Sequence, residues 1–80
     1  MIRERIKKFI VDSFLYGNED GLGNNISLTQ SGIIDSTGIL ELISFLEKEF
    51  NLTFQDDELV PQNLDSIELI SEFIVRKTAV

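Results

Sequence analysis

Residues 32–50 read GIIDSTGILELISFLEKEF and hold the strongest periodic pattern in the chain. From Ser36 onward, apolar residues recur at steps of three and four, which is the spacing that places side chains on one side of an α-helix. The predicted inner stripe consists of Ile39, Leu42, Ile43, Leu46 and Phe50. Asn51 follows as a stop signal. We therefore predict a helix from about Ser36 to Phe50, with Asp35 and Ser36 at its start.

Two further helices are predicted on either side of this segment. Residues 2–16 repeat the same spacing, with Ile2, Ile6, Phe9, Ile10, Ser13 and Phe14 on one side. Asp65-Ser66-Ile67-Glu68 matches a capping box in its aspartate form, and it precedes a periodic segment that ends near Lys77. The inner positions of that last helix are Ile67, Leu69, Ile70, Phe73 and Ile74.

The connecting segments differ in length and composition. Residues 17–34 are rich in glycine and asparagine and are typical of a long ordered loop. Residues 52–60 predict a short acidic turn or helix that is closed by Pro61, the only proline. With no β-type alternation of useful length, the expected fold is an all-α, small four-helix bundle with three main helices and one short helix. We expect residues 1–80 to form a single domain.

Composition excludes several kinds of chemistry. The 80 residues contain no cysteine and no histidine, which removes disulfides, zinc-thiolate sites and every nucleophile pair that needs an imidazole base. The polar loop at residues 18–25 lacks the ligand alternation of a calcium site and the lysine of a nucleotide loop. Asp56, Asp57 and Glu58 are better explained as acids at a helix start than as an acid-base pair. An enzyme is therefore not expected.

Most of the six phenylalanines fall on predicted inner faces, so we expect them to form the core rather than a cofactor site. Phe45 lies at the edge of its stripe, where it could either seal the core or line an entrance to it. There is no continuous apolar stretch of signal or membrane-span length. We expect a cytoplasmic monomer.

Charge is distributed unevenly along the chain, whose formal net charge is −7. Four of the seven cations lie within residues 3–8, whereas residues 35–72 contain ten acids and one cation, Lys48, or nine net negative charges. Nucleic acid is a poor partner for such a surface because its binding requires a basic track. A partner protein with a basic surface is favoured.

Ser36 is the candidate for covalent chemistry. A hydroxyl in the first turn of a helix lies where unpaired backbone N–H groups and the positive end of the helix dipole favour an attached anion such as a phosphodiester. The simpler interpretation is an ordinary helix cap, because aspartate and serine are both good capping residues.

Residues 32–38, 40–43, 46–50 and 60–67 resemble the acyl carrier protein family, which includes the peptidyl and D-alanyl carriers. The resemblance extends over about residues 2–77. It implies that Ser36 carries 4'-phosphopantetheine, donated by coenzyme A through a separate phosphopantetheinyl transferase. Acyl groups would then be held as thioesters on the terminal thiol. It also implies that Asp35 positions the transferase or its metal, and that partners contact Thr37, Leu40, Glu41, Ser44 and Glu47.

The sequence also departs from the family pattern. Thr37 stands where many carriers of primary fatty acid synthesis have leucine or methionine, while Asp-Ser-x-Gly and Val60-Pro61-x-Asn63 look more like free-standing carriers of specialised pathways. We expect a free-standing carrier of acyl or aminoacyl groups, in fatty-acid-related or specialised biosynthesis. Its partners would be an activating ligase and acyltransferase or synthase enzymes with basic docking surfaces. The alternative is a non-carrier acidic adaptor or complex subunit, with Ser36 as a helix cap.

Overall fold

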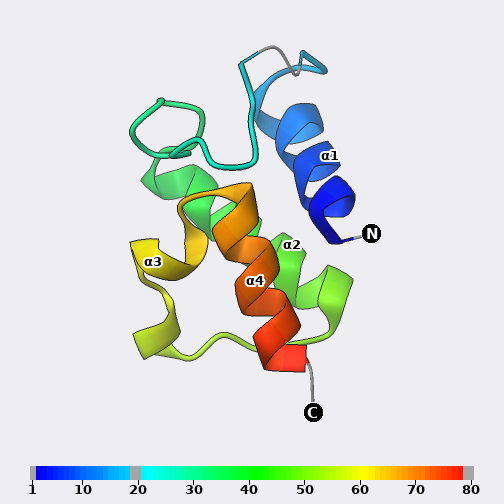
Figure 1. The fold of residues 1–80 in the computed structure, drawn as a ribbon, viewed down its shortest axis with the longest axis vertical. Coiled ribbons are helices and arrows are strands. Elements are labelled where there is room, and N and C mark those ends of the chain that lie inside the picture. The colour runs from blue at the N-terminus through cyan, green and yellow to red at the C-terminus, as the bar shows by residue number, and fades with distance from the viewer. Residues whose placement is uncertain (1, 19–20, 79–80) are drawn as a thin grey trace.

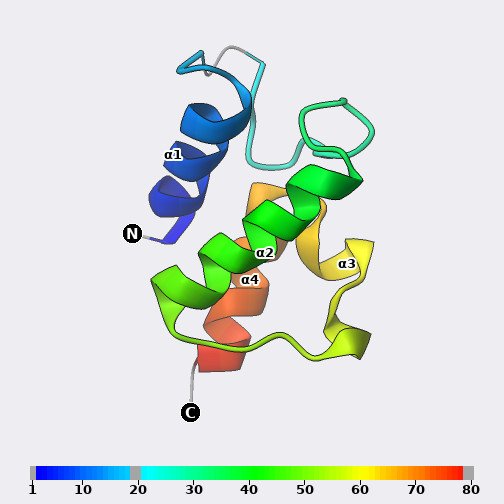
Figure 2. The ribbon, with the colours of Figure 1, turned by 180° about the vertical axis from the view of Figure 1, so that it is seen from behind.

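A computed structural model describes residues 2–18 and 21–78, and all regular structure in these ranges is helical. The elements are α1 (Ile2–Phe14), α2 (Ser36–Phe50), a 3-10 turn η1 (Asp56–Glu58), α3 (Pro61–Leu64) and α4 (Ile67–Thr78). Figures 1 and 2 show three long helices with the short α3 beside them and the α1–α2 loop across one end. The predicted all-α fold is confirmed. None of the helices in the described ranges is long and apolar enough to span a membrane.

The core lies between the three long helices and follows the predicted stripes. The fully buried side chains include Leu42 and Leu46 of α2, and α1 and α4 contribute isoleucines. Those isoleucines are Ile6, Ile10, Ile67, Ile70 and Ile74. Ser13 is the exception to the stripe predicted for residues 2–16, because its side chain is exposed. The hydrophobic effect of burying these stripes holds the bundle together.

Aromatic contacts join α1 to α2. The rings of Phe9 and Phe45 are stacked, with centroids 4.1 Å apart and planes 10° apart. The Phe14 ring meets Phe9 edge-on, at 5.9 Å and 81°. The edge-on contact of Phe14 with Phe9 is a preferred arrangement for aromatic pairs. Phe45 therefore joins α1 to α2 through this stack, and it also lines a groove of about 310 Å³ between the two helices.

Helix α1 ends at Phe14, two residues before the predicted end. Tyr16 and Gly17 have positive φ angles of 53° and 85°, which take the chain out of the helix. The Gly17 N–H donates to the Val11 carbonyl at 3.0 Å, closing the last turn. Helix α2 ends as predicted, with Asn51 in the left-handed conformation at φ 53°. Asparagine tolerates this conformation better than most residues.

Pro61 begins a helix instead of closing one, so the prediction for residues 52–60 was wrong on this point. The turn η1 covers three residues, and Pro61 is then the first residue of α3. Proline suits a first helical position because its φ is already helical and the N–H that it lacks would have no partner there.

Asp65 does not cap α4, so that part of the prediction was also wrong. The cap is Ser66, whose Oγ accepts a hydrogen bond from the Leu69 N–H at 3.1 Å. The Asp65 carboxylate instead accepts from the Ser27 hydroxyl at 2.6 Å, and from the Thr29 hydroxyl and N–H at 2.8 and 3.2 Å. Asp65 thus binds residues that are distant in the sequence instead of capping the adjacent helix. These bonds attach the α1–α2 loop to the start of α4.

Backbone contacts strengthen this attachment of the loop. The Leu28 N–H donates to the Asp65 carbonyl at 2.7 Å, and the Glu68 N–H donates to the Asn24 carbonyl at 2.9 Å. Partial burial acts to raise the pKa of Asp65, but the hydrogen bonds from Ser27 and Thr29 outweigh it, so this pKa lies below its ordinary value. The Glu68 carboxylate forms a bidentate pair with Arg3 at 2.6 and 2.7 Å rather than completing a capping box.

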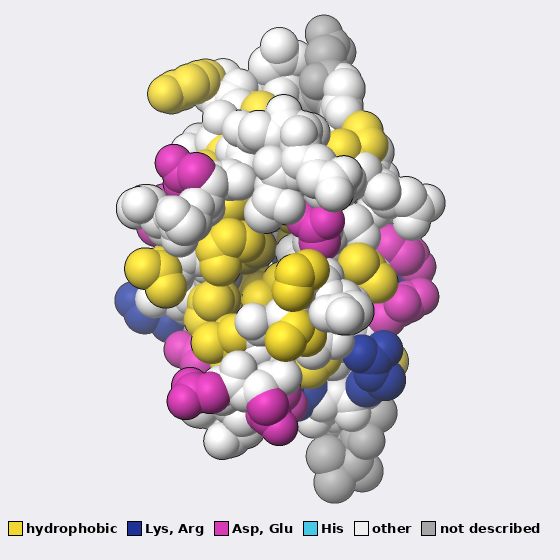
Figure 3. All heavy atoms as spheres, turned by 90° about the vertical axis from the view of Figure 1, so that its left-hand side faces the viewer, with side chains coloured by type: hydrophobic (Ala, Val, Ile, Leu, Met, Phe, Trp, Pro, Cys, Tyr) yellow, Lys and Arg dark blue, Asp and Glu magenta, His cyan; other side chains and the backbone are white. Residues whose placement is uncertain are grey.

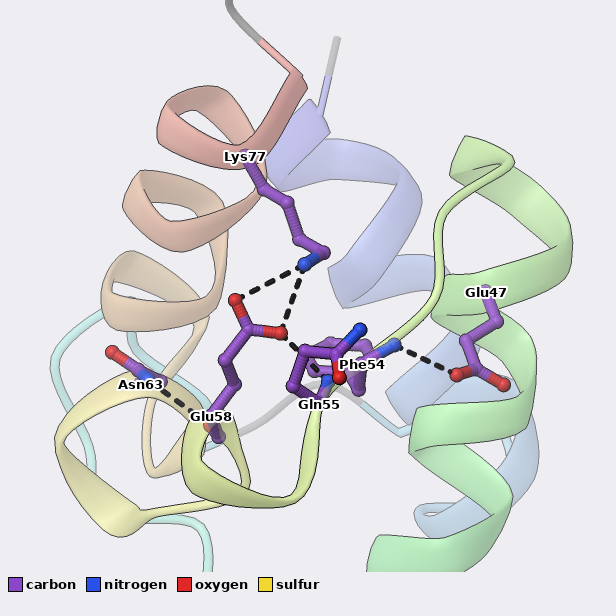
Figure 4. Close-up of polar contacts among 6 residues, drawn as sticks. All are labelled: Glu47, Phe54, Gln55, Glu58, Asn63 and Lys77. Atoms are coloured by element: carbon purple, nitrogen blue, oxygen red, sulfur yellow. Dashed lines mark hydrogen bonds and ion pairs between the residues drawn. The ribbon is translucent and has the colours of Figure 1, made fainter.

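A second polar cluster fastens η1 to the end of α4 (Figure 4). The Glu58 carboxylate accepts from the Gln55 N–H at 2.7 Å and from Lys77 Nζ at 2.8 and 3.0 Å. The Asn63 side chain donates to the Glu58 carbonyl at 3.0 Å. The Gln55 N–H, followed by Lys77, lowers the pKa of Glu58 because both favour the ionised carboxylate.

Candidate functional site

Ser36 is the first residue of α2, and its side chain is exposed. The cap of this helix is Asp35, whose Oδ1 accepts a hydrogen bond from the Gly38 N–H at 2.8 Å. The interpretation of Ser36 as the helix cap is therefore wrong, because its neighbour satisfies that role. The helix start does not explain why a serine occupies position 36.

The surroundings of Ser36 are open. Within the described residues, its hydroxyl makes no hydrogen bond, and the backbone N–H groups of Ser36 and Thr37 also have no acceptor. These N–H groups lie at the positive end of the helix dipole, where a negative group is stabilised. Thus an exposed hydroxyl stands next to two available donors.

One side of α2 continues from this end. Residues three, four and seven positions apart share a helix face, so Thr37, Leu40, Glu41 and Ser44 form a single surface, and all four are exposed. Leu40 is 68% exposed, so this face of α2 presents an apolar side chain to solvent. We call these four residues the α2 face.

Glu47 lies further along the same side but differs from the α2 face. It is partly buried, and its Oε2 accepts a hydrogen bond from the Phe54 N–H at 3.0 Å (Figure 4). This bond secures the chain that leaves α2. A role for Glu47 in contacting partners stays a prediction, and the structure gives its carboxylate an intramolecular role.

A small groove separates α2 from the segment that contains α3. Its volume is about 170 Å³, and its lining comprises Thr29, Ile39, Leu59, Val60, Pro61, Leu64 and Asp65. Ile39 stands three residues after Ser36, or about 4.5 Å along the helix axis. Figure 3 shows the side of the molecule that carries α3, where hydrophobic side chains surround a hollow with acidic side chains near its edges.

Other possible sites have less support. Among the residues that the structure describes, no three or more histidine, cysteine, aspartate or glutamate side chains are arranged to hold a metal. Glu19 and Asp20, part of the loop considered for calcium, lie outside the described residues. A wider groove of about 850 Å³ between α1 and α4 contains none of the candidate site residues.

Sequence reasoning gave no structural role to Gly38, although the structure places it at the centre of the first turn of α2. Its N–H binds the Asp35 side chain, and its Cα lies against Phe14 and Ile34. The sequence did contain an indication of such a role, because glycine stands at the third position of the predicted helix, where glutamate or glutamine is common.

Comparison with known proteins supports a carrier. No family model matches the chain. The chain is 28% identical over 79 residues to "Probable acyl carrier protein PigG" of Serratia sp. (strain ATCC 39006), covering 99% of this chain and 91% of that protein. The resemblance to the acyl carrier protein family is confirmed. This similarity to an acyl carrier protein supports a non-enzymatic carrier role.

A solved structure provides an independent comparison of the fold. One chain of the "Crystal structure of FAD-dependent dehydrogenase" superposes with a TM-score of 0.77 and 23% identity, covering 86% of this chain and 97% of that chain. At this identity the likeness shows the fold alone. It agrees with the all-helical arrangement of the described residues.

Proposed function

We propose that this protein is an acyl carrier protein that holds acyl or aminoacyl groups on 4'-phosphopantetheine attached to Ser36. The observation that carries the proposal is the exposed Ser36 hydroxyl at the first position of α2, with the capping role already taken by Asp35. The similarity to a probable acyl carrier protein along nearly the whole chain supports it. When attached, the group supplies a thiol on which acyl groups are carried as thioesters.

The residues at this end of α2 fit the phosphodiester of that group. The two open N–H groups of Ser36 and Thr37 can donate to its negatively charged oxygens, and the helix dipole favours them. In the proposed transfer, the Ser36 oxygen forms a bond to the phosphorus of the pantetheine arm, the pyrophosphate P–O bond of coenzyme A breaks, and adenosine 3',5'-bisphosphate leaves. The chain has no histidine, and we propose that the base that accepts the Ser36 proton is supplied by the transferase. Asp35 orients the turn through its bond to Gly38, and we propose that its second carboxylate oxygen meets the transferase or its metal.

The α2 face is the proposed contact surface for partner enzymes. It combines an exposed apolar side chain, Leu40, with the carboxylate of Glu41 and the hydroxyls of Thr37 and Ser44. Residues 35–72 have nine net negative charges, so a basic partner surface would be attracted over a distance of about a Debye length. The proposed partners are the phosphopantetheinyl transferase, an acyl- or aminoacyl-activating ligase and acyltransferase or synthase enzymes. A specialised rather than a primary pathway is proposed on the basis of Thr37 and of the Asp-Ser-x-Gly and Val60-Pro61-x-Asn63 patterns.

The experiment is transfer from coenzyme A in vitro. The purified protein is incubated with coenzyme A, magnesium and a broad-specificity phosphopantetheinyl transferase, and its intact mass is recorded. We expect one adduct on the wild type and on Thr53→Ala, a control at an exposed hydroxyl that lies outside the α2 face, and none on Ser36→Ala. Because Asp35 caps the helix, Ser36→Ala should remain folded by circular dichroism.

The competing adaptor function predicts a different result. A folded wild-type protein that stays unmodified under conditions where a known carrier is fully labelled would refute the carrier proposal. Labelling of Ser36→Ala would also refute it, because the attachment would then lie elsewhere.

A further inference from the structure

The first turn of α2 is packed unusually tightly on the side that faces away from Ser36. Two residues correspond to about 200° around a helix, so Gly38 faces nearly opposite to Ser36. A methyl group on the Gly38 Cα would lie 2.8 Å from Cε1 and 3.3 Å from Cζ of Phe14, and 3.0 Å from Cγ2 of Ile34. Real side chains essentially never approach below 3.0 Å, so position 38 has no room for a Cβ unless Phe14 moves.

The Phe14 ring is itself held in place. It meets the Phe9 ring edge-on at 5.9 Å, and Phe9 is stacked on Phe45 of α2 at 4.1 Å. Ile34, on the other side of Gly38, is 2% exposed, and its N–H donates to the Leu28 carbonyl at 3.0 Å. The bare Cα of Gly38 therefore rests between two side chains that the core fixes.

Gly38 also forms the polar contact that defines the helix start. Its N–H donates to Asp35 Oδ1 at 2.8 Å, and the next N–H, that of Ile39, donates to the Asp35 carbonyl at 3.0 Å. Residue 38 thus connects the core on one side with the turn that contains Ser36 on the other. Glycine is otherwise a poor choice within a helix, and replacement by alanine normally favours helix formation.

We propose that Gly38 is a positioning residue for Ser36, and that its missing side chain sets the first turn of α2 against Phe14 so that the hydroxyl is presented to the transferase. This inference rests on the proposed attachment at Ser36. A side chain at position 38 would push the turn away from Phe14 and move Ser36, while leaving Leu40, Glu41 and Ser44 of the α2 face in place. Misplacement of a reacting group by about 1 Å can lower a rate by about a hundredfold.

The experiment compares four variants with the wild type in the transfer reaction, at a temperature where each is folded by circular dichroism. They are Gly38→Ala, Phe14→Leu, the double variant and Gly23→Ala. In the double variant, Leu at position 14 lacks the Cε and Cζ atoms that a Cβ at position 38 would meet. The Ile34 side chain then has to shift by only a few tenths of an ångström to make room for that Cβ. Gly23 is the matched control because its φ is not in the left-handed region and a Cβ there would make ordinary contacts at 3.5 Å.

We expect Gly38→Ala to lower kcat by about tenfold or more with little change in KM, because docking uses mainly Leu40, Glu41 and Ser44 of the α2 face, whereas the chemical step uses the position of Ser36. The double variant should recover most of kcat, and Gly23→Ala should match the wild type. The amide peaks of Ser36 and Thr37 in a 1H–15N NMR spectrum should shift in Gly38→Ala and return toward the wild-type positions in the double variant.

Three results would overturn the inference: wild-type kcat in Gly38→Ala, a double variant no faster than Gly38→Ala, or a double variant that does not fold. The third result counts because removal of the Phe14 ring atoms should make room for the alanine. The absence of labelling in the wild type would instead refute the proposed function. The two failures are therefore distinguishable.

Discussion

Replacing Asp65 with alanine should loosen the α1–α2 loop and destabilise the fold. The substitution removes three hydrogen bonds to one carboxylate, from the Ser27 hydroxyl and from the N–H and hydroxyl of Thr29. A hydrogen bond to a charged group contributes about 1.5–3 kcal/mol. The bond from Ser27 is partly buried, so its loss should cost nearly the full free energy of one such bond. The two bonds from Thr29 are exposed, so water can replace them and their loss should cost little. We expect the free energy of unfolding to fall by about 2–3 kcal/mol.

The assay is urea denaturation followed by circular dichroism at pH 7, with Asp57→Ala as the control. Asp57 is an exposed carboxylate on η1, and its replacement should change the free energy of unfolding by no more than about 0.5 kcal/mol. If Asp65→Ala were as stable as the control variant, the loop would not be held by this carboxylate and the reasoning would fail.

The pH dependence gives a second check on Asp65. Its pKa is lowered in the folded state, so its contribution is fully present above the unfolded pKa of about 4 and is lost as the pH falls through the folded value. The difference in the free energy of unfolding between the wild type and Asp65→Ala should therefore keep its pH 7 value down to about pH 5. It should shrink below about pH 4. A difference that grows on acidification would contradict this account.

Two further predictions concern other contacts of the fold. Lys77→Met should raise the pKa of Glu58 toward its ordinary value without fully restoring it, because the Gln55 N–H still binds the carboxylate. A 13C NMR titration measures this pKa, and an unchanged value would argue against the ion pair. Phe45→Ala removes a partly buried ring stacked on Phe9 and should lower the free energy of unfolding by about 2–3 kcal/mol in urea denaturation, whereas a loss under about 0.5 kcal/mol would show that this ring does not seal α1 against α2.

The sequence predicted the helices well because each long helix buries a continuous stripe. Burial of Leu42 and Leu46, and of the isoleucines in α1 and α4, depends on a period of 3.6 residues that can be read directly from the chain. The helix ends were harder to predict. Local patterns made Asp65 a cap and Pro61 a terminator, yet Asp65 binds residues 27 and 29, 38 and 36 positions away, which no local pattern contains.

The candidate site was predictable in part. The location of Ser36 at the start of α2 followed from the sequence, but the choice of Asp35 over Ser36 as the cap depends on the backbone at residue 35. The hydrogen bond that Glu47 accepts from Phe54 and the close approach of Phe14 to Gly38 depend on tertiary packing. Periodicity indicates which face of a helix is inward, but it gives no distance between two such faces.

The most direct test of the carrier account is the chemical state of Ser36 in protein purified from the cells that produce it naturally. Peptide mapping by tandem mass spectrometry would locate any modification, and Ser44, exposed on the same helix, serves as an internal control. The account predicts phosphopantetheine on the Ser36 hydroxyl, alone or bearing an acyl or aminoacyl group, and an unmodified Ser44. Naturally produced protein with an unmodified Ser36 under every growth condition in which it is made would contradict the account.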